Sequence, residues 1–336
     1  MKIYIAFELQ ENASGGGNQF LKALKRYFTA NNQYTNQIES ADVVLFNSYQ
    51  YINELVRIKE KYPQKIYVHR VDGPICLYNN PEDKRDSITN TVNNEISDAT
   101  IFQSYWSKAR CLEYGLQTPS FSTVIMNAPD SAVFFNDSSY VKESNSKIKI
   151  ISTSWSSNIN KGFDTYKWLD DNLDFNKFDY VFIGNSPIKF KNIVIKPPMT
   201  SDNLSDELRR SDIFVTASKK DPCSNSLIEA IHCGLYPVAL DDGGHTEIVN
   251  GNGVTYSNED ELMSILYSLQ EKNEYRNVKH NLKDIESVAN DYANFFNELI
   301  KLKEEGKLKV RTLSYLGKMK IRYSILRNKV YLRFKI

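Results

Sequence analysis

The sequence has few cysteines, and their spacing is neither that of a metal site nor that of a redox motif. Cys76, Cys111, Cys223 and Cys233 stand far apart with no CxxC pair, so reduced thiols are the simplest interpretation. No stretch approaches the ~20 consecutive apolar residues of a membrane span. The apolar run at residues 1–7 is shorter than the hydrophobic region of a signal peptide. We therefore expect a cytoplasmic protein.

Acidic residues are absent from one end of the sequence. Residues 307–336 contain ten Lys or Arg and no Asp or Glu. The whole chain has 42 basic and 41 acidic residues, so the remainder has 32 basic against 41 acidic, a net charge of about −9. An acidic body does not favour nucleic-acid binding. The basic segment therefore needs a separate explanation.

Short apolar stretches alternate with amphipathic ones along a chain whose 336 residues suit two domains of roughly 150 residues each. The short stretches are hydrophobic throughout, which is typical of parallel strands covered on both faces. They are expected at residues 2–7, 42–46, 65–69, 99–103, 121–126, 148–153, 179–184, 193–196, 212–217 and 235–240. The pattern predicts an α/β fold of two Rossmann-like, doubly wound parallel sheets facing a cleft, the usual place for a ligand.

A polar stretch separates the two halves. Residues 136–147 are rich in Ser, Asn and charged side chains and form the best candidate linker. We therefore predict an N-terminal Rossmann-like domain over residues 1–140 and a C-terminal one over 147–290. A helix over 291–306, packing back on the first domain, and a basic amphipathic segment over 307–336 would complete the chain.

The segment with the most potential chemistry follows a predicted strand of the second half. The strand at 212–217 ends in a polar loop that contains Asp221. A short helix then begins near Ser224 and ends at Gly234, since glycine commonly ends a helix. The first turn of this helix exposes backbone N–H groups at the carboxyl end of a strand, and both the free donors and the helix dipole favour phosphate.

Glu229 lies inside this helix, where two interpretations are open. Asn225, Glu229 and His232 share one side at i, i+4, i+7 spacing, as the solvated polar face of an amphipathic helix would. Against this, the helix is short and lies between two apolar strands, and Glu229 is too deep to cap its first turn. A carboxylate there requires paired donors, which the two hydroxyls of a ribose supply.

Asp221 and Glu229, separated by seven residues, resemble the acidic-x7-Glu signature of family 4 of the GT-B glycosyltransferases. Four further landmarks similar to those of the family occur in the expected order, at residues 126–130, 160–164, 182–185 and 242–249. The resemblance covers nearly the whole chain short of the basic segment. It implies the GT-B fold and the transfer of a hexose from a UDP- or GDP-sugar with retention of configuration.

The resemblance also implies roles for individual residues. Glu229 would hold the donor ribose, and Asp221 would bind hydroxyls of the transferred sugar. Lys161 and the first N–H groups of the helix would hold the diphosphate, because fixed positive charge stabilises a leaving nucleoside diphosphate. These N–H groups belong to Ser224, Asn225, Ser226 and Leu227. The family typically needs no metal and the sequence has no DxD triplet, so no cofactor beyond the sugar nucleotide is expected.

Two positions depart from the family pattern. The family often has an Arg shortly before the Lys, whereas residues 152–159 contain none. Hydroxyl and amide groups such as those of Ser156 and Asn158 would take its place without supplying charge. Asp221 stands where Glu is common, which shortens the reach toward the sugar by one methylene and bears on the choice of donor.

A glycine run follows the first predicted strand and opens a helix. Because glycine lets the backbone approach a ligand closely, Gly15, Gly16 and Gly17 are expected beneath the donor phosphates, as in the family; the alternative is an ordinary turn. His245, which follows two glycines in the second half, is interpreted as a loop residue near the phosphates and not as a catalyst.

His69, Arg70 and Asp72 follow the third predicted strand, at a sheet edge where α/β proteins bind ligands. His69 resembles the cleft histidine that many members of the family place near the reacting sugar, so a catalytic and acceptor-side role is expected. Arg70 and Asp72 would bind acceptor or donor. For these two the alternative is an internal ion pair that stiffens the loop.

The basic segment 307–336 interleaves its cations with aromatic and aliphatic residues, which suits an anionic membrane surface. Gly317 interrupts an imperfect helical periodicity, so a solvated, partly disordered segment is the alternative. On the membrane interpretation the protein is peripheral at the inner face of the membrane. Its acceptor would then be a growing surface polysaccharide or lipid-linked saccharide, and no nucleic-acid partner is expected.

Two other functions fit parts of the pattern. A sugar-nucleotide epimerase of the GT-B fold would need no glycan acceptor, and hence no basic segment. A non-catalytic protein that binds sugar nucleotides or glycans would keep Glu229 without needing Lys161 and Asp221. Since all three residues are present, the sequence favours a hexosyltransferase.

Overall fold

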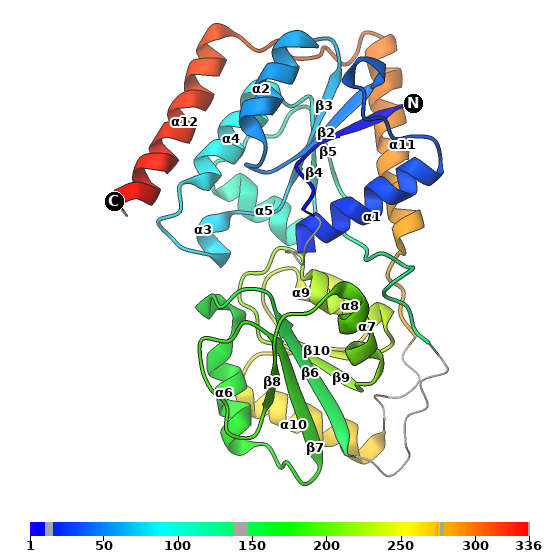
Figure 1. The fold of residues 1–336 in the computed structure, drawn as a ribbon, viewed down its shortest axis with the longest axis vertical. Helices are drawn as coiled ribbons and strands as arrows, with labels where there is room; N and C mark the ends of the chain where they lie inside the picture. Colours follow the sequence, from blue (N-terminus) through cyan, green and yellow to red (C-terminus); the bar gives the residue numbers. More distant parts are fainter. Residues whose placement is uncertain (11–15, 138–146, 274, 276–278, 335–336) are drawn as a thin grey trace. The chain divides into compact units, whose positions relative to one another are not determined.

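The chain forms two compact units, each built on one parallel sheet (Figure 1). The computed structural model describes residues 1–10, 16–137, 147–273, 275 and 279–334. Unit 1 consists of residues 1–9, 21–126 and 286–336, and unit 2 of residues 10–20 and 127–285. Both sheets are parallel throughout, so the predicted α/β fold class is confirmed. The predicted linker falls largely on residues 138–146, outside the described residues.

The sheet of unit 1 has its strands in sequence order, β1-β2-β3-β4-β5. These strands are Ile3–Ala6, Val43–Asn47, Ile66–Val71, Ala99–Phe102 and Phe121–Val124. The helices between them are α1 (Gly16–Ala30), α2 (Ile52–Lys61), α3 (Ile75–Tyr78), α4 (Arg85–Ile96) and α5 (Tyr105–Glu113). Because the strand order never reverses, this sheet lacks the switch point at which an open α/β sheet forms a ligand crevice.

The sheet of unit 2 has the order β11-β10-β9-β6-β7-β8. Its strands are β6 (Ile148–Ser154), β7 (Phe178–Gly184), β8 (Val194–Lys196), β9 (Ile213–Thr216), β10 (Tyr236–Leu240) and the unpredicted β11 (Val254–Tyr256). Its helices are α6 (Phe163–Asn172), α7 (Ser201–Arg209), α8 (Asn225–His232), α9 (His245–Val249) and α10 (Glu259–Lys272). The strand order reverses between β6 and β9, so the switch point of this unit lies there.

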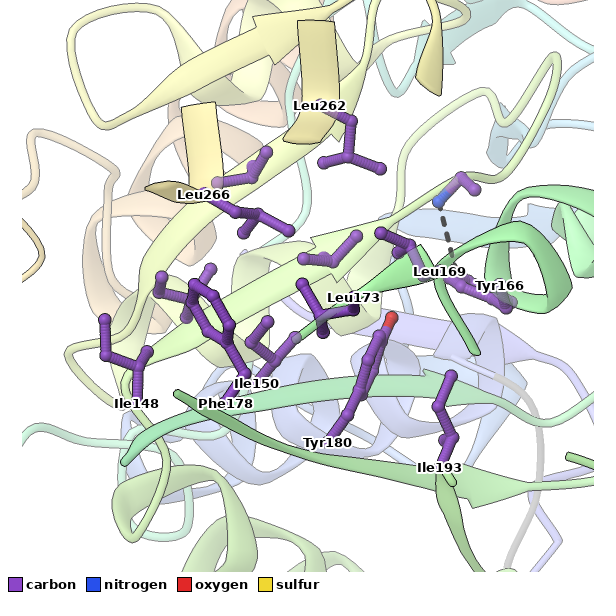
Figure 2. Packing of buried hydrophobic residues seen from close by; sticks show 14 of the residues in the cluster. Ile148, Ile150, Tyr166, Leu169, Leu173, Phe178, Tyr180, Ile193, Leu262 and Leu266 are labelled. Atoms are coloured by element: carbon purple, nitrogen blue, oxygen red, sulfur yellow. Dashed lines mark hydrogen bonds between the residues drawn. The ribbon is translucent and has the colours of Figure 1, made fainter. Parts of the chain in front are cut away.

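The core of unit 2 reaches directly to that switch point (Figure 2). Tyr166 of α6 is 2% exposed and packs against Phe182 of β7 with its ring edge. Its hydroxyl accepts a hydrogen bond of 3.1 Å from the backbone N–H of Ala217, just beyond β9. A fully buried aromatic ring therefore fixes the start of the loop that carries Asp221.

From Glu286 the chain is part of unit 1 again, through α11 (Ile285–Glu304) and α12 (Tyr315–Phe334). α12 packs against α4 and continues through Gly317. A Cβ at Gly317 would lie 2.5 Å from Oε2 of Glu95 in α4, so the glycine lets the two helices approach closely. The expectation that Gly317 interrupts a helix is wrong, and the described part of the basic segment is ordered against the unit. None of the described helices combines the length and the apolar composition needed to cross a membrane.

Candidate active site

Two loops at the switch point of unit 2 bring Lys161 and Asp221 together. The loop after β6 ends in a single 3-10 turn, η2 (Ile159–Lys161), and the loop after β9 contains Asp221. The backbone N–H of Lys219 donates to the carbonyl of Asn160 at 2.7 Å and joins the loops. Nζ of Lys161 then lies 3.0 Å from Oδ2 of Asp221. The side chains are 30% and 13% exposed, so this ion pair borders solvent.

Gly162 is the residue that allows Lys161 to lie so close to the second loop. Its φ of +78° is in the left-handed region, and an added Cβ would lie 2.1 Å from the carbonyl oxygen of Ala217. No other residue type fits this approach of two backbones. The close approach of the two backbones at Gly162 therefore fixes the position of the Lys161 backbone beside the second loop.

The carboxylate of Asp221 is charged in the empty site. Burial alone would raise its pKa, but the Lys161 ammonium and the backbone N–H of Cys223 outweigh burial and lower it. The turn after β10 supports the same loop, because the N–H of Gly244 donates to the carbonyl of Asp221 at 2.9 Å. Lys161 thus has a fixed anionic partner until a phosphate competes for it.

His245 is more deeply buried than a loop residue of the predicted kind. It is 0% exposed, and its Nδ1 lies 2.9 Å from the carbonyl oxygen of Leu240. Its Nε2 is buried without a hydrogen-bond partner among the described residues. Burial lowers the pKa of the imidazole, so the ring is neutral near pH 7 and supplies no charge to replace the missing arginine.

The side chains proposed to replace that arginine shape the loop instead. The Oγ of Ser156 accepts the N–H of Asn158 at 3.1 Å, and Oδ1 of Asn158 accepts the N–H of Asn160 at 2.9 Å. Both contacts are turn contacts that lead into η2. Their effect on a phosphate is therefore indirect, through the placement of Lys161.

Helix α8 begins at this site with its first N–H groups uncapped by a side chain. Ser224 is its N-cap residue, and it makes no side-chain capping bond. At the other end the N–H of Leu235 donates to the carbonyl of Ala230 at 3.1 Å across Gly234, whose φ is +86°. This is the glycine-ended helix that the sequence predicts. The uncapped N-terminus leaves backbone donors and a positive dipole end available to an anion.

Glu229 lies outside the buried side of α8, and no described residue is a partner of its carboxyl. Leu227, Ile228, Ala230 and Ile231 are at most 1% exposed, whereas Glu229 is only partly buried. Among the described residues its carboxyl makes neither a hydrogen bond nor an ion pair. Burial alone accounts for its pKa of about 8, so the carboxyl is mainly protonated at pH 7. A half-buried carboxyl with unused hydrogen-bonding capacity, one and a half turns from an anion-binding helix end, is suited to a diol.

The affinity for a UDP-sugar is expected to rise with pH up to about 8 and then to level off. Ribose hydroxyls that donate to Glu229 stabilise its charged form, so donor binding below pH 8 must release the proton that the free carboxyl holds. The rise would approach tenfold per pH unit at most. Calorimetric titration in two buffers of different ionisation enthalpy would count the proton. Glu229→Gln should flatten the profile; an equally steep profile in that variant would contradict the assignment.

Asn225, the first residue of α8, is held by two neighbours within unit 2. Its Oδ1 accepts a hydrogen bond of 2.9 Å from Nδ2 of Asn127, which is 3% exposed. A Cβ added at Gly16 would lie 2.3 Å from Nδ2 of Asn225, whereas one at Gly17 would meet no atom within 4 Å. Gly16 is therefore required for packing on Asn225, and Gly15 lies outside the described residues. The contact with Asn127 was not predicted, although Asn127 belongs to one of the sequence landmarks.

His69 lies buried inside unit 1, and its surroundings do not favour the catalytic role predicted for it. It is 0% exposed and stacks on Phe46 with ring centroids 4.4 Å apart. Nδ1 lies 2.9 Å from Oδ1 of Asn93, and Nε2 lies 3.0 Å from the carbonyl oxygen of Ser48. Burial lowers its pKa to about 4 despite these contacts. A sugar cannot reach either ring nitrogen.

Arg70 and Asp72 form the internal ion pair that was the alternative for them. Arg70 is 0% exposed, and its Nη1 lies 2.7 Å from Oδ1 of Asp72. Oδ2 of Asp72 accepts hydrogen bonds from Nδ2 of Asn47 at 3.1 Å and from Oγ of Ser48 at 2.9 Å. The guanidinium is thus enclosed, which favours the internal ion pair over the ligand-binding role predicted for Arg70. Only Asp72, whose side chain is 24% exposed, borders solvent.

Replacing His69 with alanine is expected to affect stability and not catalysis. The change opens a cavity beside Phe46 and leaves the carbonyl of Ser48 without its partner, which costs about 3 kcal/mol of unfolding free energy. Urea unfolding would measure this loss. The turnover number, measured where the variant is still folded, should stay within about twofold of wild type; a loss of about a hundredfold in turnover with unchanged stability would restore the catalytic role.

Among the described residues, no group of three or more His, Cys, Asp and Glu side chains could hold a metal ion. The candidate site of unit 2 accordingly consists of one cation, two carboxyl groups and a helix N-terminus. These groups have the chemistry to bind a phosphate, through Lys161 and α8, and hydroxyl groups, through Asp221 and Glu229. A nucleoside diphosphate attached to a sugar presents both kinds of group.

The site lies at the switch point of a parallel sheet, where open α/β proteins bind ligands. Residues 177–271, which include Asp221, α8 and Glu229, match the model of the family described as Glycosyl transferases group 1. The predictions of a glycosyltransferase and of the GT-B fold are thereby confirmed. The assignment to family 4 in particular stays a prediction.

Solved structures with the same fold cover nearly the whole chain. Sucrose-phosphate synthase from Thermosynechococcus elongatus is similar over 89% of this chain and 98% of its own, with a TM-score of 0.69 and 12% identity. HepE of Anabaena, in complex with UDP-glucose, is similar over 91% of this chain and 100% of its own, with a TM-score of 0.64 and 14% identity. At such identities the likeness shows the fold. No curated protein matches the chain significantly in sequence.

Proposed function

We propose that this protein transfers a hexose from a UDP- or GDP-sugar to a hydroxyl of a growing surface polysaccharide or lipid-linked saccharide, with retention of anomeric configuration. The observation that carries the proposal is the unpartnered carboxyl of Glu229 on α8, whose uncapped first turn follows the Lys161–Asp221 pair. Two hydrogen-bond acceptors for a diol and a cationic site for a diphosphate are what a sugar nucleotide requires.

In this proposal the donor replaces the contacts that the site residues make with one another. The diphosphate binds Lys161 in place of Asp221, and the freed Asp221 carboxylate accepts hydrogen bonds from hydroxyl groups of the sugar. Negative charge grows on the diphosphate as the glycosidic bond breaks, and Lys161 and the N-terminus of α8 stabilise that charge. The acceptor attacks the same face from which the diphosphate departs, and the leaving phosphate takes the acceptor proton. These steps use no metal and no further cofactor.

Support for the donor class comes from the fold and the site together. HepE, which shares the fold, is described as a complex with UDP-glucose. The basic residues of 307–336 support an acceptor carried at an anionic membrane surface, and hence a peripheral location at the inner face of a membrane. An epimerase would use the same donor site but would have no use for that surface. A binding protein would not need the Lys161–Asp221 exchange.

A transfer assay tests this proposal. The purified protein would be incubated with UDP- and GDP-sugars and a membrane extract, and sugar incorporation would be followed for wild type and Glu229→Ala. We expect transfer from at least one donor by wild type and not by the variant. Interconversion of the donor sugar without incorporation would indicate the epimerase, and donor binding without any turnover would indicate the binding protein.

A further inference from the structure

The outward side of α12 carries an apolar stripe. Its members are five large side chains spaced three and four residues apart: Leu316, Met319, Tyr323, Leu326 and Val330. Their exposed fractions are 70%, 45%, 67%, 59% and 46%. Three-and-four spacing places side chains on one side of a helix, so these residues form a continuous strip of exposed apolar surface. Scattered exposed apolar residues need no explanation, but an aligned set of them marks an interaction site.

The opposite side of α12 is part of the fold of unit 1. Ile321 is 1% exposed and belongs to the core formed by β2, α2 and α4. Oγ of Ser324 lies 3.0 Å from Oγ1 of Thr91 in α4, and the N–H of Arg311, ahead of the helix, donates to Oδ1 of Asp98 at 2.6 Å. Figure 1 shows α12 lying along α4. α12 is therefore held in place by its contacts within unit 1, and the stripe lies on its outward side.

Cations border the stripe on both sides. On a helix with 3.6 residues per turn, Arg322 and Lys329 follow one edge, and Lys320 and Arg327 follow the other. Lys320 lies 2.7 Å from Glu95, but Arg322, Arg327 and Lys329 are exposed and form no ion pair among the described residues. An apolar strip between two rows of cations is the arrangement of helices that lie in a membrane interface.

We propose that α12 binds an anionic lipid surface along this stripe, with the helix parallel to the membrane. The apolar side chains enter the boundary between headgroups and acyl chains, and the flanking cations contact lipid phosphates. The inference depends on the proposed function for the membrane-borne acceptor and gives the membrane contact a defined face. A second copy of the chain is a poorer occupant, because residues 307–336 contain no acidic residue and pairing two stripes would bring four rows of cations together.

Vesicle sedimentation tests the electrostatic part. Wild type is expected to bind vesicles of phosphatidylcholine with about one third phosphatidylglycerol, and to bind far less to phosphatidylcholine alone. The triple variant Arg322→Gln, Arg327→Gln, Lys329→Gln should lose about a hundredfold in partition coefficient, since each cation near an anionic surface contributes about fivefold. Equal binding to both kinds of vesicle, or full binding by the variant, would overturn the proposal.

The matched control removes the same charge elsewhere on unit 1. Arg57 and Lys61 of α2 and Lys301 of α11 have side chains that are 74%, 72% and 76% exposed. Their triple change to Gln should bind the anionic vesicles within about twofold of wild type, because these cations belong to α2 and α11 and are not among those that border the stripe. A loss as large as that of the α12 variant would mean that net charge alone attracts the protein, which would overturn a defined docking face.

The apolar part has its own variant. Tyr323→Ser with Leu326→Ser keeps every charge and every buried contact of α12, and it should also reduce vesicle binding by at least about tenfold. If sedimentation instead showed a dimer that this variant dissociates, the stripe would join two copies, and the lipid proposal would be wrong. Donor binding separates this inference from the proposed function. The α12 variants should bind a UDP-sugar like wild type, whereas Glu229→Ala should bind vesicles normally and lose the donor.

Discussion

Replacing Glu229 with alanine is expected to reduce the affinity for the sugar nucleotide, and with it kcat/KM, by at least about a hundredfold. In the proposed function the carboxylate accepts hydrogen bonds from two hydroxyl groups of the ribose, and a hydrogen bond to a charged group contributes about 1.5–3 kcal/mol. No other described side chain offers an unpartnered carboxyl on this face of α8. Calorimetric titration with the donor and a transfer assay would measure the two losses.

The same position should show an opposite effect on stability. Burial raises the pKa of Glu229 to about 8, and its carboxyl has no partner among the described residues, so this side chain destabilises the fold. Glu229→Met fills a similar volume without a polar group and should raise the melting temperature of unit 2 by a few degrees, corresponding to about 1 kcal/mol. Loss of activity together with loss of stability would show instead that Glu229 is a structural residue.

Replacing Lys161 with alanine is expected to lower kcat by about a hundredfold to a thousandfold, because one preplaced charge-stabilising donor typically contributes that much to a transition state. The loss should be larger than usual for one lysine, since residues 152–159 supply no second cation. Lys161→Arg keeps the charge and should retain much more activity. Single-turnover measurements with saturating donor would isolate the chemical step.

Lys219 is the matched control for Lys161. It lies in the partner loop and pairs with Asp164 at 2.8 Å, with both side chains largely exposed. An exposed pair of this kind contributes little, so Lys219→Ala should keep kcat within about twofold of wild type. Equal losses in the two alanine variants would show that the site responds to its total charge, and not to a cation at the position of Lys161.

The sequence predicts the strands and the donor-side loops well because the signals there are local. Strands covered on both faces are apolar throughout, and a helix that ends at glycine after such a strand identifies α8 from neighbouring residues alone. The close approach of Gly162 to Ala217 was not predicted, because it joins two loops that are distant in the sequence.

The contacts that the sequence did not predict involve residues whose surroundings come from distant parts of the chain. The partners of His69 are Ser48 and Asn93, which lie 21 and 24 residues away, and no local pattern indicates that they enclose it. Strand order, which removes the switch point from unit 1, is likewise a matter of long-range pairing. Gly317 interrupts a periodicity in the sequence, but it is required by a contact with Glu95, more than two hundred residues earlier.

The return of residues 286–336 to unit 1 has a consequence for the order in which the protein can fold during synthesis. The strands of unit 1 are synthesised before residues 127–285 of unit 2, whereas the helices that complete its packing, α11 and α12, follow them. Unit 2 is therefore complete before α11 and α12 have emerged and can fold while unit 1 is still incomplete, since domains generally fold as they are synthesised. Until α11 and α12 have been synthesised, part of the core of unit 1 remains exposed, including the side against which Ile321 packs. A nonsense mutation in the codons for α11 or α12 would therefore damage the domain that was begun first.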